Sequence, residues 1–505
     1  MLLINPPVVK PCEPPAGIAR LAGALQAAGR SCRLVDCAIE GVLYLLRGEL
    51  SPEDTWSRRA VRHLEDNLQR LQDPTLYTQP ARYQRAVADV NRVLALAGRA
   101  HGLSLQLANY QDSQLSPLRS QDLLSAAAHY EDNIFYPYFS RRLSGLLETA
   151  NPTVIGFSLN YLSQALPTFA MMGYVKEHYP CLTLVLGGGL VTSWMRNPGW
   201  RAPFAGLVDH CVAGPGEQPL LELLGLSAPV KQDCPDYQHL ARQPYMAPGF
   251  ILPYAASSGC YWSKCSFCPE TAEGNPYQVL SSRQVLRDVQ QLRNRHNPVL
   301  LHLLDNAVSP QLMTALARQS SGLAWYGFAR ASELLTDLDF CIRLRASGCV
   351  MLKLGLESGD QQVLDAMDKG IHLDLVSRVL TTLEAAGIAT YVYLLFGTPA
   401  ETDAGAEKTL DFIVRHHSAV TFLNLAIFNL PVCSAEVKGL QVCPDDGSDL
   451  SLYRQFVHPR GWSRGRVRRF LDKEFKRHPA IAPILQRDPY LFSSNHASFL
   501  IQGRS

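Results

Sequence analysis

The residues of clearest chemical interest are three cysteines in the second half of the chain. Cys260, Cys265 and Cys268 lie within nine residues in a C-x4-C-x2-C pattern, although the whole chain of 505 residues has only 13 cysteines. Three thiolates on one loop match a cubane iron–sulfur cluster in which one iron lacks a protein ligand. An iron left open in this way can bind a small molecule and pass an electron to it. The spacing therefore predicts a reactive cluster.

Two other interpretations of the cysteine pattern stay open. A structural zinc site normally has four ligands, but no Cys or His follows at the spacing of a zinc finger, so His302 would have to join it through folding. A redox pair of Cys265 and Cys268 would leave Cys260 unexplained. These interpretations support a non-enzymatic alternative, a metal-binding interaction or sensor protein that holds zinc or an inert cluster.

The loop resembles the cluster site of radical S-adenosylmethionine (SAM) enzymes, in which an aromatic residue precedes the last cysteine, as Phe267 does here. The segments G-L-E-S-G at 355–359 and G-T-P-A-E-T at 397–402 are similar to two further motifs of that family. The likeness covers about residues 250–430. It implies a [4Fe–4S] cluster whose open iron binds SAM, cleavage of SAM to a 5′-deoxyadenosyl radical, and an electron donor such as a flavodoxin or ferredoxin.

The resemblance also implies which residues contact SAM. Glu357 and Ser358 follow an expected strand and suit the ribose hydroxyls or the methionine ammonium group. Arg330 suits the SAM carboxylate. The expected SAM-binding residues are Phe267, Arg330, Gly355, Glu357, Ser358 and Gly397. The alternatives are a surface ion pair for Arg330 and a helix N-terminal position for Glu357.

The cysteine loop departs from the family's usual C-x3-C-x2-C spacing by one residue. The extra residue lies between Cys260 and Cys265, so the first cysteine must be reached by a different backbone path. Cluster binding is still expected, while the orientation in which SAM is held is left open.

The N-terminal segment resembles the cobalamin-binding domain that precedes the barrel in one branch of the radical SAM family. The likeness is carried by L-L-I-N-P-P at 2–7 and by glycine turns at 187–189 and 214–217. It implies a corrinoid cradle, since glycines at strand ends let a flat cofactor approach the backbone. The expected cobalamin-binding residues are Ser158, Gly187, Gly188, Gly189, Gly214 and Glu217.

The histidine that such domains supply to cobalt is missing. Ala38 has its place after Asp36, and Leu190 replaces the histidine of a second family motif. If cobalamin binds, its lower face is expected to receive water or a non-histidine group. The alternative is a degenerate domain without a corrinoid.

The elements that must position these residues follow from the apolar pattern. Strands alternate with helices twice, which predicts an α/β protein with two parallel sheets. We expect a doubly wound, cobalamin-binding-like Rossmann domain over 1–225, with a helical insertion at 40–150 that has no clear strand. A linker follows over 226–249. A partial (β/α)6 TIM-like barrel over 250–432 and a small helical region over 433–505 complete the chain. The barrel strands are expected at 251–255, 299–304, 323–328, 350–355, 390–396 and 420–427.

Charge and apolar content exclude several classes of protein. The chain has 47 Lys+Arg and 45 Asp+Glu, with a formal net charge of +2 at pH 7, which argues against nucleic-acid binding through phosphates. No run of eighteen apolar residues is present, and no basic segment precedes the first apolar run, so neither a membrane span nor a signal peptide is predicted. A cytoplasmic protein with reduced cysteines is expected.

The resemblance implies a cobalamin-dependent radical SAM methyltransferase that acts on an unactivated carbon. A radical rearrangement, cyclisation or oxidation without methyl transfer is the second expectation. The substrate is not identified by any motif.

Overall fold

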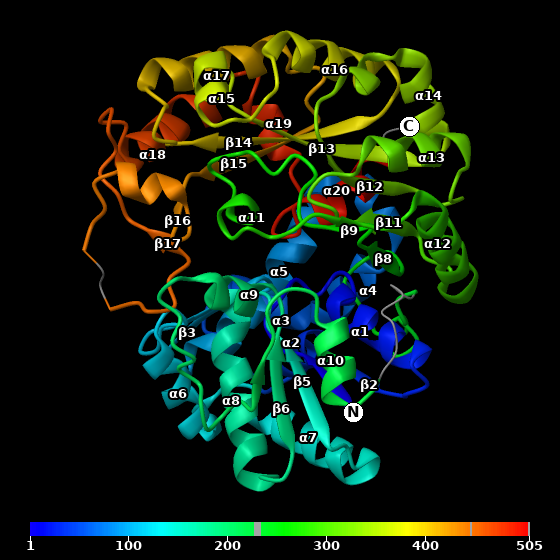
Figure 1. Ribbon diagram of the computed structural model, residues 1–505, viewed down its shortest axis with the longest axis vertical. Helices are drawn as coiled ribbons and strands as arrows, with labels where there is room; N and C mark the ends of the chain where they lie inside the picture. Colours follow the sequence, from blue (N-terminus) through cyan, green and yellow to red (C-terminus); the bar gives the residue numbers. More distant parts are fainter. Residues whose placement is uncertain (227–233, 445–446, 503–505) are drawn as a thin grey trace. The chain divides into compact units, whose positions relative to one another are not determined.

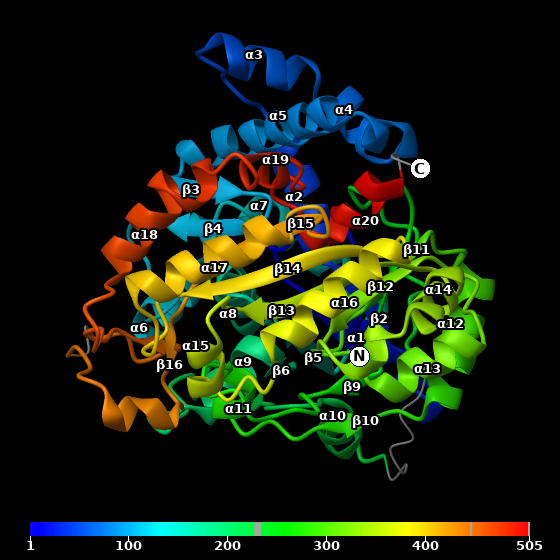
Figure 2. The same cartoon turned by 90° about the horizontal axis from the view of Figure 1, so that it is seen from above.

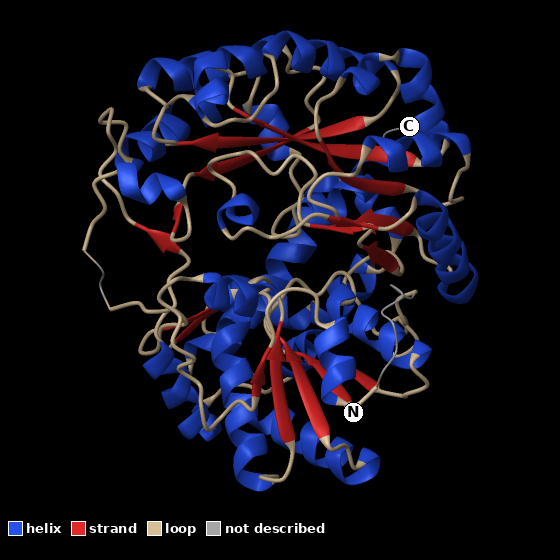
Figure 3. Cartoon of the chain, viewed as in Figure 1, coloured by secondary structure: helices blue, strands red, loops and turns tan. Residues whose placement is uncertain are grey.

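The computed structural model describes residues 1–226, 234–444 and 447–502. The chain forms two compact units. Of the described residues, unit 1 contains 1–226, 234–250 and the short segment 447–452, and unit 2 contains the remainder. Each unit is built on its own parallel sheet, as Figure 3 shows.

The sheet of unit 1 has five parallel strands in the order β2-β1-β5-β6-β7. Its strands are β1 (Leu2–Asn5), β2 (Arg33–Asp36), β5 (Val154–Ser158), β6 (Thr183–Gly187) and β7 (His210–Cys211). All residues of β1 and β5 are buried, which explains their nearly continuous apolar sequences. The chain leaves β1 toward β2 and later returns to its other side as β5. Right-handed connections therefore put the helices that follow β1 and β5 on opposite faces, the doubly wound arrangement.

Those helices are α1 (Ala16–Ala27), which packs on β1 and β2, and α8 (Leu162–His178), which packs on other helices of the unit. The helix α10 (Glu217–Leu223) lies against α1, and α9 (Gly189–Arg196) begins at the glycine turn after β6. The expectation of an N-terminal doubly wound α/β sheet is confirmed.

The insertion between β2 and β5 is mostly helical. Its helices are α2 (Cys37–Leu46), α3 (Thr55–Arg62), α4 (Leu64–Leu71), α5 (Pro80–Arg99), α6 (Ser120–Ala128) and α7 (Tyr136–Ala150). The expectation that it contains no strand is wrong, because β3 (Leu103–Gln106) and β4 (Asn109–Asp112) form an antiparallel hairpin. Leu103 and Leu105 are buried while Ser104 between them is exposed, a period-two pattern that a search for helices overlooks.

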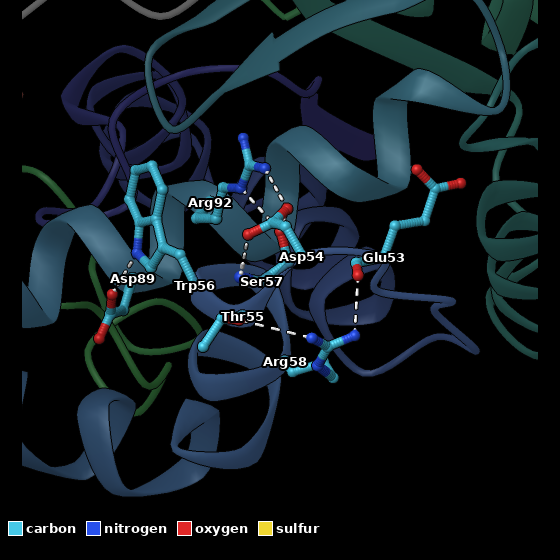
Figure 4. A network of polar contacts seen from close by, with 8 residues as sticks. All are labelled: Glu53, Asp54, Thr55, Trp56, Ser57, Arg58, Asp89 and Arg92. Carbon is cyan, nitrogen blue, oxygen red and sulfur yellow. Dashed lines mark hydrogen bonds and ion pairs between the residues drawn. The ribbon is translucent and has the colours of Figure 1, made fainter.

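Polar contacts join α3 to α5 within this insertion (Figure 4). The Trp56 indole N–H donates to Asp89 at 2.7 Å, and Arg92 donates to Asp54 at 2.6 Å and to the Ser57 hydroxyl at 2.9 Å. Hydrogen bonds from Ser57 and Arg92 hold the pKa of Asp54 below its ordinary value. These contacts fix one helix pair and involve none of the residues expected to bind a cofactor.

The segment expected to be a linker is largely part of unit 1. Residues 227–233 lie outside the described residues. Tyr237 and Leu240 are fully buried, and the Tyr245 hydroxyl donates to Asp36 at 2.8 Å. Burial raises the pKa of Asp36 to about 6, so this carboxyl group belongs to the core of the unit.

The sheet of unit 2 has six parallel strands in the order β15-β14-β13-β12-β11-β8. These are β8 (Ile251–Tyr254), β11 (Leu300–Leu303), β12 (Trp325–Ala329), β13 (Cys349–Glu357), β14 (Ala389–Phe396) and β15 (Phe422–Ile427). Every expected barrel strand is present, in the expected order. The partial barrel is therefore confirmed, and its strands all end on one side.

Helices cover the outer face of this sheet. They are α12 (Ser282–His296), α13 (Pro310–Arg318), α14 (Leu338–Ala346), α15 (Gln361–Ala366), α16 (Leu373–Ala385) and α17 (Asp403–Arg415). Side-chain caps begin several of them: Ser281, Ser309 and Thr402 each accept a backbone N–H of the first turn. Figure 1 shows α14–α17 on one side of the sheet and α11 (Pro269–Ala272) with α20 (Ser494–Gln502) on the other.

The C-terminal region is mostly helical, as expected. It contains α18 (Arg464–Lys473), α19 (Ala482–Gln486) and α20. Its short strand β17 (Tyr453–Arg454) pairs antiparallel with β16 (Leu430–Pro431), which precedes the region. Contacts of α19 with β15 and of α20 with β13 place this region against the barrel (Figure 2). None of the helices in the described part of the chain is both long and apolar enough for a membrane crossing.

Candidate active site

The cysteine loop starts at a glycine that no other residue could replace without movement. Gly259 follows the short strand β9 (Ser257–Ser258) and has φ of +69°. A Cβ atom there would lie 2.5 Å from the carbonyl oxygen of Pro276. The Asn306 side chain donates to the Gly259 carbonyl at 3.1 Å, so the turn that follows β11 fixes the start of the loop. Backbone conformation and close packing therefore both require glycine here.

Asp305 binds the residues that precede the cysteine loop. Its carboxylate accepts from the Ser257 hydroxyl and, at 3.1 Å, from the Ala256 N–H, and the residue is 2 % exposed. Burial raises the pKa of Asp305, while these hydrogen bonds lower it. The aspartate thus positions the loop rather than facing solvent.

The loop is joined to the segment that follows the G-L-E-S-G motif. The Ser266 N–H donates to the carbonyl of Met367 at 3.0 Å, and the Trp262 indole N–H donates to that of Asp368 at 3.1 Å. Arg330, from the end of β12, donates to the next two carbonyls, those of Lys369 and Gly370. Two side chains and one backbone amide therefore bind the carbonyl groups of residues 367–370.

Trp262 and Arg330 also contact each other. The guanidinium carbon of Arg330 lies 3.8 Å from the Trp262 ring centroid, which is a cation–π contact. Gly370 has φ of +62°, and a Cβ atom there would lie 2.1 Å from the Trp262 ring. We name Trp262, Arg330 and residues 367–370 the loop clamp.

The backbone of the longer cysteine loop turns at Ser263. Ser263 lies in the left-handed region with φ of +48°, and both Ser263 and Lys264 are exposed. The longer path between Cys260 and Cys265 therefore turns outward, with Trp262 directed into the clamp.

The three cysteines are half-buried neighbours on this loop. Burial raises the pKa values of the Cys265 and Cys268 thiols; Lys369 and Arg330 lower that of Cys265, and Cys260 raises that of Cys268. Their thiols thus interact electrostatically. Across the described ranges, no three His, Cys, Asp or Glu residues lie close enough together to hold a single metal ion.

Glu357 lies beside the cysteine loop at the end of β13. It has φ of +69°, which is uncommon for a residue other than glycine, and its carboxylate pairs with Lys369 at 2.8 Å. Lys369 also lies over the Phe267 ring, at 5.4 Å from the centroid. Gly355 makes room for this ion pair: a Cβ atom there would lie 2.5 Å from the Glu357 carboxylate and 2.9 Å from the Lys369 ammonium group. Phe267, Gly355 and Glu357 are thus brought together.

Two expected SAM residues make contacts within unit 2 that do not involve the Glu357–Lys369 pair. Ser358 is fully buried, lies 3.2 Å from the Thr409 hydroxyl of α17 and accepts the Asp360 N–H at 3.1 Å, so it faces away from Glu357. Gly397 donates its N–H to Glu401 and faces Val467 of α18. Arg330 donates to the carbonyls of Lys369 and Gly370 in the loop clamp. The sequence had led us to expect a bond to the SAM carboxylate or a surface ion pair.

Glu401 joins the turn after β14 to the C-terminal region. It is fully buried and accepts the indole N–H of Trp462 at 2.8 Å. Burial raises its pKa to about 7, against the lowering effect of its hydrogen bonds. His458 reaches the same turn at the Thr398 carbonyl, 2.8 Å away. Glu401 therefore connects the turn after β14 to the segment before α18.

Sequence reasoning missed Trp262, Lys369 and Asp305. Trp262 stands in the variable part of the cysteine motif, and Lys369 stands ten residues after the G-L-E-S-G segment. Trp262 donates to the Asp368 carbonyl, Lys369 pairs with Glu357, and Asp305 accepts from Ala256 and Ser257, and no spacing in the sequence indicates these partners.

The expected cobalamin residues lie at the strand ends of unit 1. Ser158 ends β5 and accepts from the Asn160 side chain at 3.1 Å, and a Cβ atom on Gly17 would lie 3.5 Å from its hydroxyl. Gly187 ends β6, and the Gly189 N–H donates to Asn160 at 2.9 Å. A Cβ atom at Gly214 would meet nothing within 4 Å. The edge therefore fits a flat cofactor that approaches the backbone.

Two members of that set are explained by contacts within the unit. A Cβ atom on Gly188 would lie 2.4 Å from the Leu159 carbonyl, so this glycine lets two turns pack together. Glu217 is 6 % exposed and pairs with Arg20 of α1. The residues at the two histidine positions of the family, Ala38 and Leu190, are buried in the core.

The comparisons with known proteins agree with this geometry. Residues 254–413 match the model of the radical SAM superfamily. Among curated proteins, the chain is 24% identical over 286 residues to the hopanoid C-3 methylase of Methylococcus capsulatus, covering 49% of this chain and 54% of that one. It is also 24% identical over 208 residues to the anaerobic magnesium-protoporphyrin IX monomethyl ester cyclase of Rubrivivax gelatinosus, covering 39% and 36%. The chain thus spans between a third and about half of these relatives.

Among solved structures, the radical SAM methyltransferase TsrM from Kitasatospora setae matches with a TM-score of 0.57 at 15% identity, over 93% of this chain and 90% of that one. The cobalamin-dependent radical SAM enzyme OxsB matches with a TM-score of 0.54 at 14% identity, over 84% and 52%. The chain therefore contains a radical SAM domain, the domain type that works with a [4Fe–4S] cluster and SAM, and has the fold of cobalamin-dependent members of that superfamily. The expected recognition is confirmed.

Proposed function

We propose that this radical SAM enzyme is a cobalamin-dependent methyltransferase that acts on an unactivated carbon. The observation that carries the radical SAM part of the proposal is the loop clamp, because it holds the cysteine loop beside Glu357 at the strand ends of one barrel. A reactive cluster beside a SAM site requires the cysteine loop and the end of β13 to lie close together, although they are about 90 residues apart in the sequence.

The chain's own residues supply binding and positioning. Cys260, Cys265 and Cys268 would hold the cluster, and Glu357 with Lys369 would bind the polar groups of SAM next to it. When bound, the cluster and SAM supply a 5′-deoxyadenosyl radical, and cobalamin supplies a methyl group that can be transferred. Arg330 and Lys369 put two positive charges beside Cys265, which offset the charge of the thiolates. An external reductant of the flavodoxin or ferredoxin class would provide electrons.

The cobalamin part of the proposal has separate support. Ser158, Gly187, Gly189 and Gly214 line the strand ends of a doubly wound sheet, where flat cofactors bind. The structural neighbour OxsB is described with aqua-cobalamin and SAM bound, and TsrM with cobalamin and a [4Fe–4S] cluster. Ala38 and Leu190 supply no imidazole, so cobalt would have water or another group on its lower face.

A radical reaction without methyl transfer is the second candidate. The relative from Rubrivivax gelatinosus is a cyclase, and it matches at the same identity as the methylase. The two candidates share the cluster and SAM but differ in the fate of the SAM methyl group.

The test is anaerobic reconstitution of the full chain with iron, sulfide, cobalamin and methyl-labelled SAM. We expect iron and sulfide in cubane proportions, 5′-deoxyadenosine after reduction, and label recovered in the corrinoid fraction. Cys260→Ala, Cys265→Ala and Cys268→Ala should each abolish 5′-deoxyadenosine formation. Cys181→Ala and Cys443→Ala, which change exposed cysteines outside the loop, are the matched controls. Label found only in methionine and uncleaved SAM, and none in the corrinoid fraction, while 5′-deoxyadenosine forms would favour the second candidate.

A further inference from the structure

Three arginines line one pocket of unit 1, between α2, α7 and the start of β2. Arg141 and Arg142 belong to α7, and Arg33 is the first residue of β2. The pocket has a volume of about 520 Å³, and small-molecule sites usually measure roughly 300–1,000 Å³. None of the described residues that line it is expected to bind the cluster, SAM or cobalamin. We name it the arginine pocket.

The arginine pocket lies at the end of the sheet opposite to the expected corrinoid residues. Arg33 pairs with Leu2 where the parallel strands β1 and β2 begin. Ser158 and Gly187 lie where β5 and β6 end. Because parallel strands all begin at one edge of a sheet and end at the other, the pocket is separate from the corrinoid edge.

Arg142 is held in one orientation by a glutamate and a tyrosine. Its Nε donates to the Glu40 carboxylate at 2.7 Å, and its Nη2 donates to the same group at 2.9 Å. The Tyr138 hydroxyl donates to Glu40 at 2.8 Å, and Tyr138 is only 8 % exposed. Burial raises the pKa of Tyr138, so its hydroxyl keeps the proton that it donates. These bonds orient Arg142 and leave its Nη1 unused.

The arginine pocket has a net positive charge. The side chains of Arg33 and Arg141 are exposed, and neither has a hydrogen-bond or ion-pair partner among the residues that the structure describes. Glu40 balances Arg142 alone, and no acidic residue is among the described residues that line the pocket. Two guanidinium charges are therefore left for a ligand. A phosphate monoester carries a charge of about −1.5 to −2 at pH 7, which matches them.

An aromatic ring forms another part of the pocket wall. Tyr44 of α2 is 38 % exposed, and its ring centroid lies 5.8 Å from that of Tyr138, with an interplanar angle of 37°. Pro137 and Leu146 add apolar surface. A partly exposed tyrosine that packs on a buried ring offers a fixed face to a flat molecule. The pocket thus combines two unpaired cations with an aromatic surface.

We propose that the arginine pocket binds a small molecule with a phosphate monoester on a flat ring, the chemical class to which mononucleotides belong. Arg33 and Arg141 bind the phosphate, and Tyr44 contacts the ring. Guanidinium groups donate paired, charge-assisted hydrogen bonds to phosphate oxygens. A phosphate dianion interacts with both charges, whereas a carboxylate or a sulfate ester carries only one charge. The site is independent of the proposed radical SAM chemistry, because it shares no residue with it.

The test is calorimetry of the full chain, without a reductant, at a pH of about 7.5, where a phosphate monoester is mostly a dianion. The probes are 2-naphthyl phosphate, 2-naphthyl sulfate and inorganic phosphate, none of which contains the adenosine group of SAM. We expect wild type to bind naphthyl phosphate about ten-fold more tightly than naphthyl sulfate, because of the second charge. It should also bind naphthyl phosphate about ten-fold more tightly than inorganic phosphate, because of the ring.

Three variants separate the two contacts. Arg33→Gln and Arg141→Gln should each weaken binding of naphthyl phosphate by about ten-fold and remove its advantage over naphthyl sulfate. Tyr44→Ala should weaken binding of naphthyl phosphate and leave that of inorganic phosphate unchanged. Arg82→Gln, which changes an exposed arginine of α5, should behave as wild type. The changed side chains are all exposed, so the variants should fold, and thermal unfolding of each one checks this.

The proposed site would be overturned if wild type did not bind naphthyl phosphate, or if Arg33→Gln and Arg141→Gln both bound it as wild type does. Equal binding of naphthyl phosphate and naphthyl sulfate by wild type would overturn the phosphate class. Unchanged affinity for naphthyl phosphate in Tyr44→Ala would overturn the ring contact.

Discussion

At the scale of residues, Arg330 is the side chain that links the parts of the candidate site. It extends from β12 to the carbonyls of residues 369 and 370 and stacks on Trp262 at 3.8 Å. It also interacts electrostatically with the thiols of Cys260 and Cys265. Loss of this one side chain should loosen the cysteine loop without removing any cluster ligand.

Arg330→Gln and Trp262→Ala should therefore release iron faster than wild type when a chelator is added to the reconstituted protein. A cation–π contact of about 1.4 kcal/mol corresponds to about a ten-fold faster release. Arg466→Gln is the matched control, because Arg466 lies over Trp462, at 5.7 Å from its ring centroid, away from the cysteines. Release of iron at the wild-type rate from both loop variants would show that the loop clamp does not hold the cluster site.

Gly355→Ala tests the residue that makes room for Glu357. The added methyl group would meet the carboxylate and the ammonium group of the Glu357–Lys369 pair, so the pair must move. We expect SAM binding to weaken by about ten-fold, which corresponds to the loss of about 1.4 kcal/mol. Gly145→Ala in α7 is the control, since a Cβ atom there meets nothing within 4 Å and alanine favours a helix. Unchanged SAM affinity in Gly355→Ala would contradict the assignment of this pair to SAM.

Residue types and spacing predicted part of this site and missed the rest. The three cysteines, Phe267 and Glu357 belong to motifs, so a sequence could place them near one another. Ser358 is adjacent to Glu357, yet the turn directs it toward Thr409 instead. The direction of a side chain depends on the backbone path. The left-handed φ of Glu357 changes that path between Glu357 and Ser358, and the sequence alone does not indicate this change.

At the scale of elements, the turn after β14 depends on a buried carboxyl group. Glu401 accepts from the N–H of Gly397 and from Trp462, so it connects the barrel to the segment before α18. Burial raises its pKa from 4.5 to about 7. The folded chain therefore keeps a proton that the unfolded chain releases near its ordinary value.

The free energy of unfolding should decrease as the pH rises from about 4.5 to about 7, because the folded state binds more protons than the unfolded state in this window. A shift of this size corresponds to about 3 kcal/mol. Glu401→Gln, which keeps an acceptor for Trp462, should remove that part of the pH dependence. Urea unfolding of both proteins at several pH values measures the difference. Parallel curves for the two proteins would contradict a raised pKa at Glu401.

The elements themselves were largely predictable. Each barrel strand is an apolar run that lies between two helical segments. Some of these helices begin at a side-chain cap, such as Ser281 or Ser309. The hairpin of β3 and β4 was not found, because its alternation is short and lies within a helical region. The segment around Tyr237 has the prolines and aspartates that are typical of a linker. Its buried side chains, Tyr237 and Leu240, are too few to form an apolar pattern.

At the scale of the whole molecule, the two sets of cofactor residues belong to different units. The cysteines, Glu357 and Lys369 are in unit 2, whereas Ser158, Gly189 and Gly214 are in unit 1. Each set is positioned by its own sheet. Binding of a corrinoid and assembly of a cluster should therefore be independent.

The full chain with Cys260→Ala, Cys265→Ala and Cys268→Ala together should take up cobalamin as wild type does while binding no cluster. Gly214→Val should do the opposite, because its φ of +75° disfavours valine and the side chain would enter the open strand edge. Absorbance of the corrinoid and iron content measure the two properties. Loss of both cofactors in either variant would show that the two sites are coupled.

The most direct test of the central claim is electron paramagnetic resonance of the reduced, reconstituted protein with SAM labelled at its amino nitrogen and carboxylate oxygens. If three cysteines leave one iron open, the spectrum should change when SAM is added, and the labels should show hyperfine coupling to the cluster. A spectrum that SAM leaves unchanged, or a protein that binds zinc in place of iron, would contradict the account.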